Sequence, residues 1–402
     1  MKKFSKVLAL VLALSLALAL GACSGNGGGQ GASPTPAGGN DTPTSQAPAE
    51  SQPPAESQAP SGGDGSILAA DGTFEIAMIT DKGDINDKSF NQGTWEGIKS
   101  YCSTNGKTCK YYKPASADTN AYVTSIEQAI NDGAKVVVTP GFLFEEPIYI
   151  VQDAHPDVKF VLIDGNPHDA SYADYKTASN TVGILFAEEQ VGYLAGYAAV
   201  KDGYTKLGFL GGQAVPAVVR YGYGFVQGAD AAAQELGVDV EMKYFYTGGF
   251  EATPEAQAMA AGWYSSGTEV IFACGGSVGN SAMAAAEANN GKVIGVDVDQ
   301  SSESATVISS AMKGLASSVE QMLDSYYNDS FSVGGQNLTL GAAENAVSLP
   351  MDTSKWTSFS QADYDALFGK LADGSITLKK DTDADDPTGL GAAKVTVDYV
   401  VE

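Results

Sequence analysis

The sequence has 402 residues, of which 44% are hydrophobic and 18% charged, and 23 Lys and Arg against 48 Asp and Glu give a formal net charge of −25. Such an acidic chain repels phosphate backbones and anionic lipid, which argues against nucleic acid or a charged membrane surface as its partner. The length suits two folded domains rather than one.

The first 22 residues have the layout of a lipoprotein signal peptide. Basic residues at positions 2, 3 and 6 precede an apolar run at residues 7–20, which is too short to span a bilayer comfortably. A small pair, Gly21 and Ala22, then comes directly before Cys23. We expect cleavage after residue 22 and acylation of Cys23, for example by palmitate, which would anchor the chain to the outer face of a cell membrane. The alternative is an ordinary secretory signal followed by a chance cysteine.

Residues 23–66 are predicted to be a disordered linker. They are Gly, Ser, Pro, Thr, Gln and Ala with a few acids, and no aromatic or large aliphatic residue occurs between Cys23 and Ile67. Such a segment cannot bury enough apolar surface to offset the entropy lost on ordering. Its expected role is that of a flexible tether between a membrane lipid and a folded domain.

The first half of the remaining chain alternates short β-rich runs with amphipathic helical patterns. Continuous apolar runs such as Val136-Val137-Val138 suit parallel strands that are covered on both faces. Helices are predicted to begin near Ser89 and to cover residues 123–132, each following a strand. Strands are predicted at residues 75–79, 110–113, 136–138, 160–163 and 181–186.

The second half repeats this cycle after a predicted helix at residues 188–200. Strands are predicted at residues 207–210, 242–246, 270–273, 293–296 and 305–309, with helices between them and two more after them. Two α/β cycles of similar length predict an α/β fold with two doubly wound parallel-sheet lobes, joined by a multi-strand hinge. We assign residues 72–203 and 305–335 to the N-terminal lobe, and residues 204–304 and 336–402 to the C-terminal lobe. A cleft is expected between them.

Three cysteines follow Cys23. Cys102 and Cys109 flank a turn-like stretch, and an export compartment allows a disulfide between them, with two thiols as the alternative. Cys274 lies in an apolar run and is predicted to be a small buried hydrophobe.

No catalytic residue is predicted. Residues 275–279 match the G-x-S-x-G pattern of a hydrolase, but His155 and His168 both precede Ser277, so the general base is missing from its expected place in the chain. An esterase that uses Ser277 is therefore a minor alternative. The acidic run at residues 381–386 lacks the glycine and the final acid of a calcium loop, and we expect neither a metal site nor a cofactor.

The most distinctive stretch is residues 79–93, which read ITDKGDINDKSFNQG and lead from the first strand into the first helix. It resembles the signature of the basic membrane protein (PnrA-like) family of nucleoside-binding lipoproteins. Further matches follow in order at residues 191–198, 207–212, 294–300 and 309–313, and the resemblance covers residues 74–378. It implies a type I periplasmic-binding-protein fold.

The resemblance also implies a ligand site. A purine base would stack between Phe90 and Phe250, one ring from each lobe, while Asp164 or Asp81 accepts hydrogen bonds from its edge. Asp297 and Lys313 would hold the ribose hydroxyls, and Gly276 would allow close approach of the backbone. The alternatives are core packing for Phe90 and helix capping for Asp164 and Asp297. The full predicted set is Asp81, Ser89, Phe90, Asp164, Phe250, Gly276, Asp297 and Lys313.

We therefore expect the substrate-binding lipoprotein of an ABC-type importer, a monomer that binds guanosine, inosine or adenosine and delivers it to permease and ATPase subunits. Alternatives are another flat or sugar-like ligand, such as a flavin or a sugar, and a receptor domain that passes its closed state to a membrane sensor. A closed cleft would gain affinity because the ligand contacts both lobes.

Overall fold

The computed structural model describes residues 65–401. The predicted signal peptide, Cys23 and nearly all of the predicted linker lie outside the described residues. Within the described part of the chain, no helix has the length and apolar character needed to cross a membrane.

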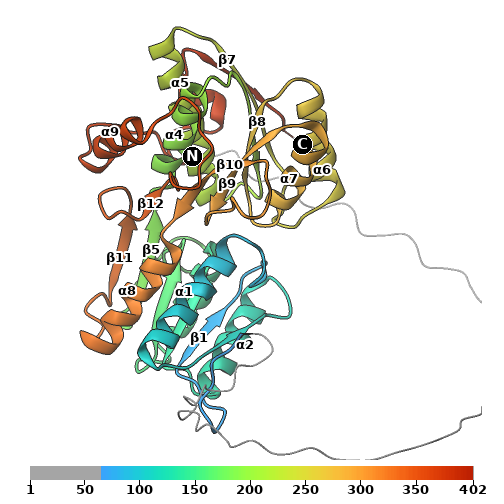
Figure 1. The fold of residues 1–402 in the computed structure, drawn as a ribbon. Helices are drawn as coiled ribbons and strands as arrows, with labels where there is room; N and C mark the ends of the chain where they lie inside the picture. Colours follow the sequence, from blue (N-terminus) through green and yellow to red (C-terminus); the bar gives the residue numbers. More distant parts are fainter. Residues whose placement is uncertain (1–64, 402) are drawn as a thin grey trace, which may run out of the picture. The chain divides into compact units, whose positions relative to one another are not determined.

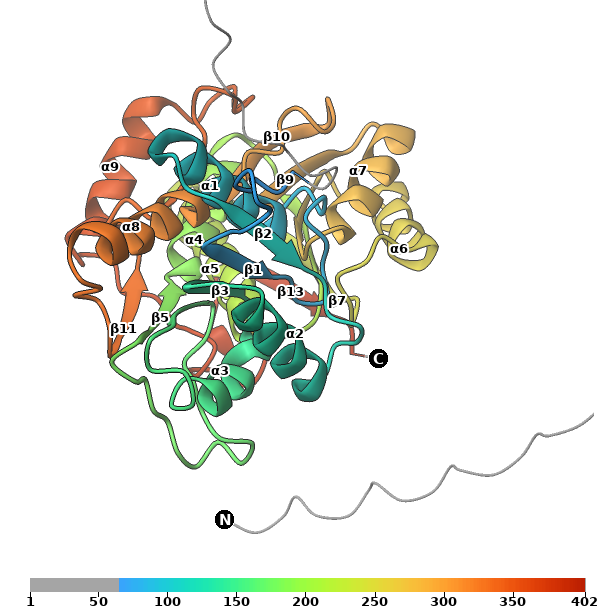
Figure 2. The same cartoon turned by 90° about the horizontal axis from the view of Figure 1, so that it is seen from below.

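The N-terminal lobe is built on a six-stranded parallel sheet in the order β11-β5-β4-β3-β1-β2. The residues of β1 and β3 are all buried, because helices cover both faces of the sheet and the apolar runs can therefore be continuous. Figure 2 shows the strands following one another across this lobe. Their bounds are β1 Ile76–Ile79, β2 Cys109–Tyr112, β3 Val136–Pro140, β4 Lys159–Ile163, β5 Thr181–Phe186 and β11 Gln336–Leu340.

Four helices and a short 3-10 turn cover this sheet. Helix α2 begins after Asp118, whose side chain accepts a hydrogen bond from the backbone of Ala121, and α1 ends at Gly106 in a left-handed conformation. Helix α8 packs beside α1 although the two are far apart in the sequence (Figure 1). The helices are α1 Phe90–Asn105, α2 Thr119–Asn131, α3 Glu145–Val151 and α8 Leu315–Asn328, with the 3-10 turn η1 at Phe142–Phe144.

The C-terminal lobe has a seven-stranded sheet in the order β12-β10-β9-β8-β6-β7-β13. All neighbours are parallel except β12, which runs antiparallel to β10. The last strand, β13, extends the sheet at the edge formed by β7. The bounds are β6 Lys206–Gly211, β7 Val240–Tyr246, β8 Val270–Cys274, β9 Lys292–Asp297, β10 Val307–Lys313, β12 Val347–Ser348 and β13 Val395–Tyr399.

Two helices of this lobe pack unusually closely. An added Cβ at Gly196 would lie 2.1 Å from the carbonyl oxygen of Phe225, and one at Gly228 would lie 2.0 Å from that of Tyr193. Glycine therefore sets the separation of α4 and α5. The helices of the C-terminal lobe are α4 Glu188–Lys201, α5 Pro216–Leu236, α6 Pro254–Ser265, α7 Val278–Asn289 and α9 Gln361–Ala372, with a 3-10 turn, η2, at Pro387–Leu390.

The chain passes between the lobes at Ala187, Gly314 and Gly341, so the lobe boundaries differ from the predicted ones. Strand β10 pairs with β9 in the C-terminal lobe, β11 pairs with β5 in the N-terminal lobe, and α4 packs on α5. The crossings lie side by side, since Ala187 donates a backbone hydrogen bond to Leu340 and Gly314 donates one to Ala346. The predicted strand at residues 305–309 was too short, and the extra residues of β10 carry the chain to the hinge.

Cys102 and Cys109 are both buried thiols, and the predicted disulfide is not formed in the structure. The side-chain hydrogen bond with Cys109, together with burial, raises the pKa of Cys102. Cys274 is buried at the end of β8, as the sequence predicts.

Candidate ligand-binding cleft

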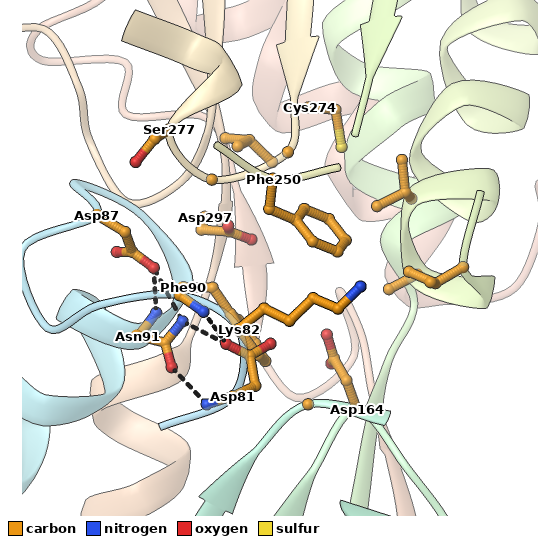
Figure 3. A pocket seen from close by; sticks show the side chains of 18 of the residues that line it. Asp81, Lys82, Asp87, Phe90, Asn91, Asp164, Phe250, Cys274, Ser277 and Asp297 are labelled. Carbon is orange, nitrogen blue, oxygen red and sulfur yellow. Dashed lines mark hydrogen bonds between the residues drawn. The ribbon is translucent and has the colours of Figure 1, made fainter. Parts of the chain in front are cut away.

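A cavity of about 380 Å³ lies between the lobes, at the carboxyl ends of their strands. The N-terminal lobe contributes Asp81, Phe90 and Asp164 to its lining, and the C-terminal lobe contributes Phe250 and Asp297. Figure 3 shows Phe250 and Asp297 on one side of the cavity, with Asp81 and Asp164 on the other. Any ligand in this space would therefore touch both lobes.

The structure brings all but one of the eight predicted ligand residues to this cavity: Asp81, Phe90, Asp164, Phe250, Gly276, Asp297 and Lys313. Ser89 is the exception. It is fully buried, and its hydroxyl donates a short hydrogen bond to Asp297 Oδ2. Ser89 therefore acts on the cavity through Asp297 rather than by lining it.

The carboxyl group of Asp81 is held by its own loop. Its Oδ1 accepts hydrogen bonds from the backbone of Gly83 at 2.7 Å and from Asn91 Nδ2 at 2.9 Å. Burial raises the pKa of Asp81 to about 6, and these two hydrogen bonds only partly counter it. The neighbouring Asp87 has a structural role, because it accepts hydrogen bonds from three backbone amides at the start of α1.

Asp164 and Asp297 occupy equivalent places in the two lobes. Each comes at the carboxyl end of a strand, β4 or β9, in a left-handed backbone conformation, with φ of 60° and 68° respectively. Neither stands at a helix start, so the capping alternative does not apply. Such a conformation is uncommon outside glycine, and Asp and Asn are among the side chains that tolerate it.

The two carboxylate oxygens of Asp164 differ in their contacts. Its Oδ2 forms a short ion pair with Lys313. Its Oδ1 is buried and has no hydrogen-bond partner among the described residues. Burial raises the pKa of Asp164 to about 6 against the opposing effect of Lys313. Since Asp164 lines the cavity, this unpartnered buried acceptor calls for a donor from a ligand or from water.

Lys313 stands at the end of β10 with its ammonium group almost fully enclosed. Besides Asp164, it pairs with Glu188 Oε1 at 3.0 Å, and its Nζ lies 4.8 Å from the centre of the Phe90 ring. Burial alone would lower the pKa of Lys313, but the surrounding carboxylates outweigh it and raise that pKa. An ammonium group has three donors, and Asp164 takes one of them, while the contact with Glu188 Oε1 is an ion pair without hydrogen-bond geometry.

Asp297 is held from both lobes. Ser89 binds one of its oxygens, and the hydroxyl of Tyr221 lies 3.5 Å from the other and 3.3 Å from the carbonyl oxygen of Ala311. Burial raises the pKa of Asp297, and Lys313 opposes that shift.

Two rings from different lobes border the cavity. Phe90 begins α1, and Phe250 lies in the turn after β7; both are only partly buried. An added Cβ at Gly212 would lie 2.7 Å from the Phe250 ring, and one at Gly276 would lie 3.3 Å from its carbonyl oxygen. Gly276, with φ of 54°, therefore makes room for the backbone of Phe250.

Residues 74–371 match the family model described as "ABC transporter substrate-binding protein PnrA-like". The chain belongs to this family. Its members are the substrate-binding components of ABC transporters rather than enzymes. They face the outside of the membrane and work with permease and ATPase subunits.

The PnrA-like chain is 29% identical to the "ABC transporter nucleoside-binding protein BmpA" of Lactococcus lactis subsp. cremoris, with 74% of this chain and 88% of that protein aligned. It is 28% identical to "Basic membrane protein A1" of Borrelia garinii subsp. bavariensis, over 76% of this chain and 88% of that one.

Solved structures of ABC transporter solute-binding proteins have the same fold. The protein from Aeropyrum pernix K1 has a TM-score of 0.67 at 22% identity, covering 78% of this chain and 95% of its own. The protein from Conexibacter woesei DSM 14684 has a TM-score of 0.62 at 26% identity, covering 77% and 99%. The predicted type I periplasmic-binding-protein fold is confirmed.

Several residues of the PnrA-like cavity were not predicted. Lys82 reaches across the cleft, where its ammonium group donates to Gln213 Oε1 at 3.4 Å (Figure 3 shows Lys82 in the cavity). Tyr221 lies in the second turn of α5. Glu188, the first residue of α4, does not line the cavity but acts on it through its ion pair with Lys313. Lys82 could have been predicted, because it lies in the stretch that resembles the family signature. Tyr221 could not, because a tyrosine within a helical pattern is usually a core residue.

Ser277 does line the cavity, but no histidine accompanies it. His155 pairs with Glu127 at 2.8 Å and His168 with Glu145 at 3.1 Å, and neither lines the cavity. Among the described residues, no group of His, Cys, Asp and Glu side chains is placed to hold a metal ion.

Proposed function

We propose that this protein binds a purine nucleoside in the cavity between its lobes and delivers it to the permease of an importer. The observation that carries the proposal is the combination, around one cavity, of an aromatic ring from each lobe with acceptor carboxylates and the buried ammonium group of Lys313. This set matches the needs of a ligand with a flat apolar face, a polar edge and vicinal hydroxyls. The printed name of the Lactococcus relative, a nucleoside-binding protein, supports it further.

In this proposal the base lies between Phe90 and Phe250. Stacking on an aromatic side chain contributes roughly 1–3 kcal/mol per base. The N–H groups on the edge of the base donate to Asp164 Oδ1, which has no described protein partner, and to Asp81. A purine base offers such donors, whereas a simple sugar has no flat face to fill the space between the rings.

The ribose hydroxyls then interact with Asp297 and with a donor of Lys313 that Asp164 does not use. A hydroxyl can donate to the carboxylate and accept from the ammonium group at the same time. Ser89, which does not line the cavity, already donates to Asp297 from the other lobe and so holds the carboxylate in place. Ligand contacts made by both lobes favour the closed form, and the closed form docks on the permease. A lipid on Cys23 keeps the protein beside that permease.

Calorimetric titration with guanosine, inosine and adenosine tests the proposal, with ribose and riboflavin as comparison ligands. We expect saturable binding of at least one purine nucleoside and none of free ribose. If none of the three nucleosides binds, the proposal is wrong. Tight binding of riboflavin or a sugar in their place would assign the cavity to a different ligand.

A further inference from the structure

The chain beyond the family match forms a folded C-terminal segment, residues 379–401, that lies on α5. The side-chain amide of Gln227 binds this segment twice, accepting from Lys379 N at 2.8 Å and donating to Lys379 O at 2.9 Å. Tyr223 donates to the carbonyl oxygen of Ala384 at 3.1 Å, and Asp230 accepts from the backbone just before β13. The segment is thus fixed to the helix that begins beside the cavity.

Two adjacent residues of this segment meet two buried charges. Lys380 Nζ lies 3.3 Å from Oε1 of Glu189, which is 2% exposed, and Asp381 Oδ1 lies 3.4 Å from Nη1 of Arg220, which is 8% exposed. A buried charge without a partner is strongly unfavourable, so both pairs matter more than ion pairs on an open surface.

Arg220 connects this pair to the ligand cavity. Its Nε donates to Glu188 Oε2 at 2.6 Å, while Glu188 Oε1 pairs with Lys313 at 3.0 Å. Glu188 is fully buried, and each of its two carboxylate oxygens forms an ion pair with one of these two cations. Although burial would raise the pKa of Glu188, Arg220 and Lys313 lower it. Charges therefore alternate from the segment to the cavity: Asp381, Arg220, Glu188, Lys313, Asp164.

We propose that Asp381 is a positioning residue for the ligand cavity. By holding the guanidinium of Arg220 at its far end, Asp381 keeps Arg220 on one oxygen of Glu188 and leaves the other oxygen to Lys313. Lys313, which lines the cavity, then keeps a donor for the ligand. The C-terminal segment contributes to binding without touching the ligand, and this last step rests on the proposed function.

The first test needs no ligand. Asp164→Asn and Asp381→Asn each remove one anion from opposite ends of the row of charges. Urea midpoints are measured for both single variants and for the double variant. We expect the shift of the double variant to differ from the sum of the two single shifts, because connected sites couple, whereas distant and unconnected sites add. The matched control is Asp398→Asn, which removes the same charge from the exposed part of the same segment, and its cycle with Asp164→Asn should be additive. If the shifts of the urea midpoint are additive in the Asp164/Asp381 cycle as well as in the Asp164/Asp398 cycle, the proposal is wrong, whatever the ligand.

The second test measures affinity for whichever nucleoside binds the full-length wild type. Asp381→Asn should raise Kd by at least about twofold, since coupled neighbours interact by about 0.5–3 kcal/mol. Asp381→Glu, which keeps the charge, should restore most of the affinity, and Asp398→Asn should leave it unchanged. Equal affinity of Asp381→Asn and wild type would refute the positioning role, as would a loss that Asp381→Glu fails to restore. If the wild type binds no nucleoside, the proposed function fails, and the first test alone decides the coupling.

Discussion

Phe90 and Phe250 each present a ring to the cavity from a different lobe, which makes the stacking proposal testable at the level of single residues. Phe90→Ala and Phe250→Ala should each weaken nucleoside binding by about 1–3 kcal/mol in calorimetry, because one stacked face is lost. Phe368→Ala is the matched control, since Phe368 is also partly buried but lies on α9 and does not line the cavity. Unchanged affinity in both cavity variants would contradict stacking.

Asp81 should make binding and stability respond to pH in opposite directions. Burial raises its pKa to about 6 from 3.8, so the folded chain holds the proton more tightly than the unfolded chain. The stability that protonation contributes is therefore complete below about pH 4 and is lost as the pH rises through about 6. Going from pH 7.5 to 5.5 should raise the free energy of unfolding by about 1 kcal/mol through Asp81.

Nucleoside affinity should fall over the same pH range, by up to about fourfold, because a protonated carboxyl accepts hydrogen bonds from the base more weakly than a carboxylate. Urea unfolding and calorimetry at the two pH values measure both effects. Asp81→Asn is the control, and it should reduce both pH dependences. If the affinity of the wild type is the same at both pH values, Asp81 does not bind the nucleoside.

Sequence reasoning located the cavity through residues that belong to one recognisable stretch or follow a strand. Asp81 and Phe90 were expected at the cleft because their stretch follows a strand, and the carboxyl ends of parallel strands meet at one edge. Asp164 and Asp297 were assigned from the family resemblance. Tyr221, Glu188 and Arg220 were missed because they lie within helices, where an aromatic or charged residue has no local sign of function. Only the packing of α4 and α5 brings Tyr221 to the cavity and places Glu188 and Arg220 behind Lys313.

The α4–α5 pair is the element whose packing can be tested most directly. Gly196→Ala should lower the free energy of unfolding by about 1–3 kcal/mol, because the new methyl group meets a backbone carbonyl at 2.1 Å and the helices must separate. Gly262→Ala in α6 is the control. Its Cβ meets nothing within 4 Å, so it should gain about 0.5–1 kcal/mol. Equal urea midpoints for the two variants would contradict this account of the interface.

At the element level, apolar runs predicted the central strands well, and the errors lay at the hinge, at α3 and at the last strand, β13. The pattern of residues 305–309 identified a strand, but a short apolar run does not indicate which of two sheets will take it. Strand β11 has partly exposed, polar residues, because it lies at the edge of its sheet, and periodicity gave no signal for it.

At the level of the whole molecule, one apolar cluster runs through both lobes. It includes Ile76 and Trp95 of the N-terminal lobe together with Val191 and Phe209 of the C-terminal lobe. The three crossings add covalent connections to this shared core. We therefore expect the lobes to unfold in a single cooperative transition.

Tryptophan fluorescence can test this cooperativity. The variant Trp263→Phe/Trp356→Phe reports on Trp95 in the N-terminal lobe, and Trp95→Phe/Trp356→Phe reports on Trp263 in the C-terminal lobe. The urea transitions of the two variants should show the same cooperativity and should coincide with the loss of circular dichroism in each variant. Fluorescence that changes well before the dichroism in either variant would mean that the lobes unfold separately.

The left-handed backbone at Asp164 and Asp297 limits how this pocket could be redesigned as a biosensor. A library that randomises both positions would consist mostly of misfolded or weakened variants, because few side chains accept φ near 60°. Asn and Gly are the practical replacements there. New specificity would be sought more productively at lining positions with ordinary backbone geometry, such as Val215 and Val218 at the start of α5.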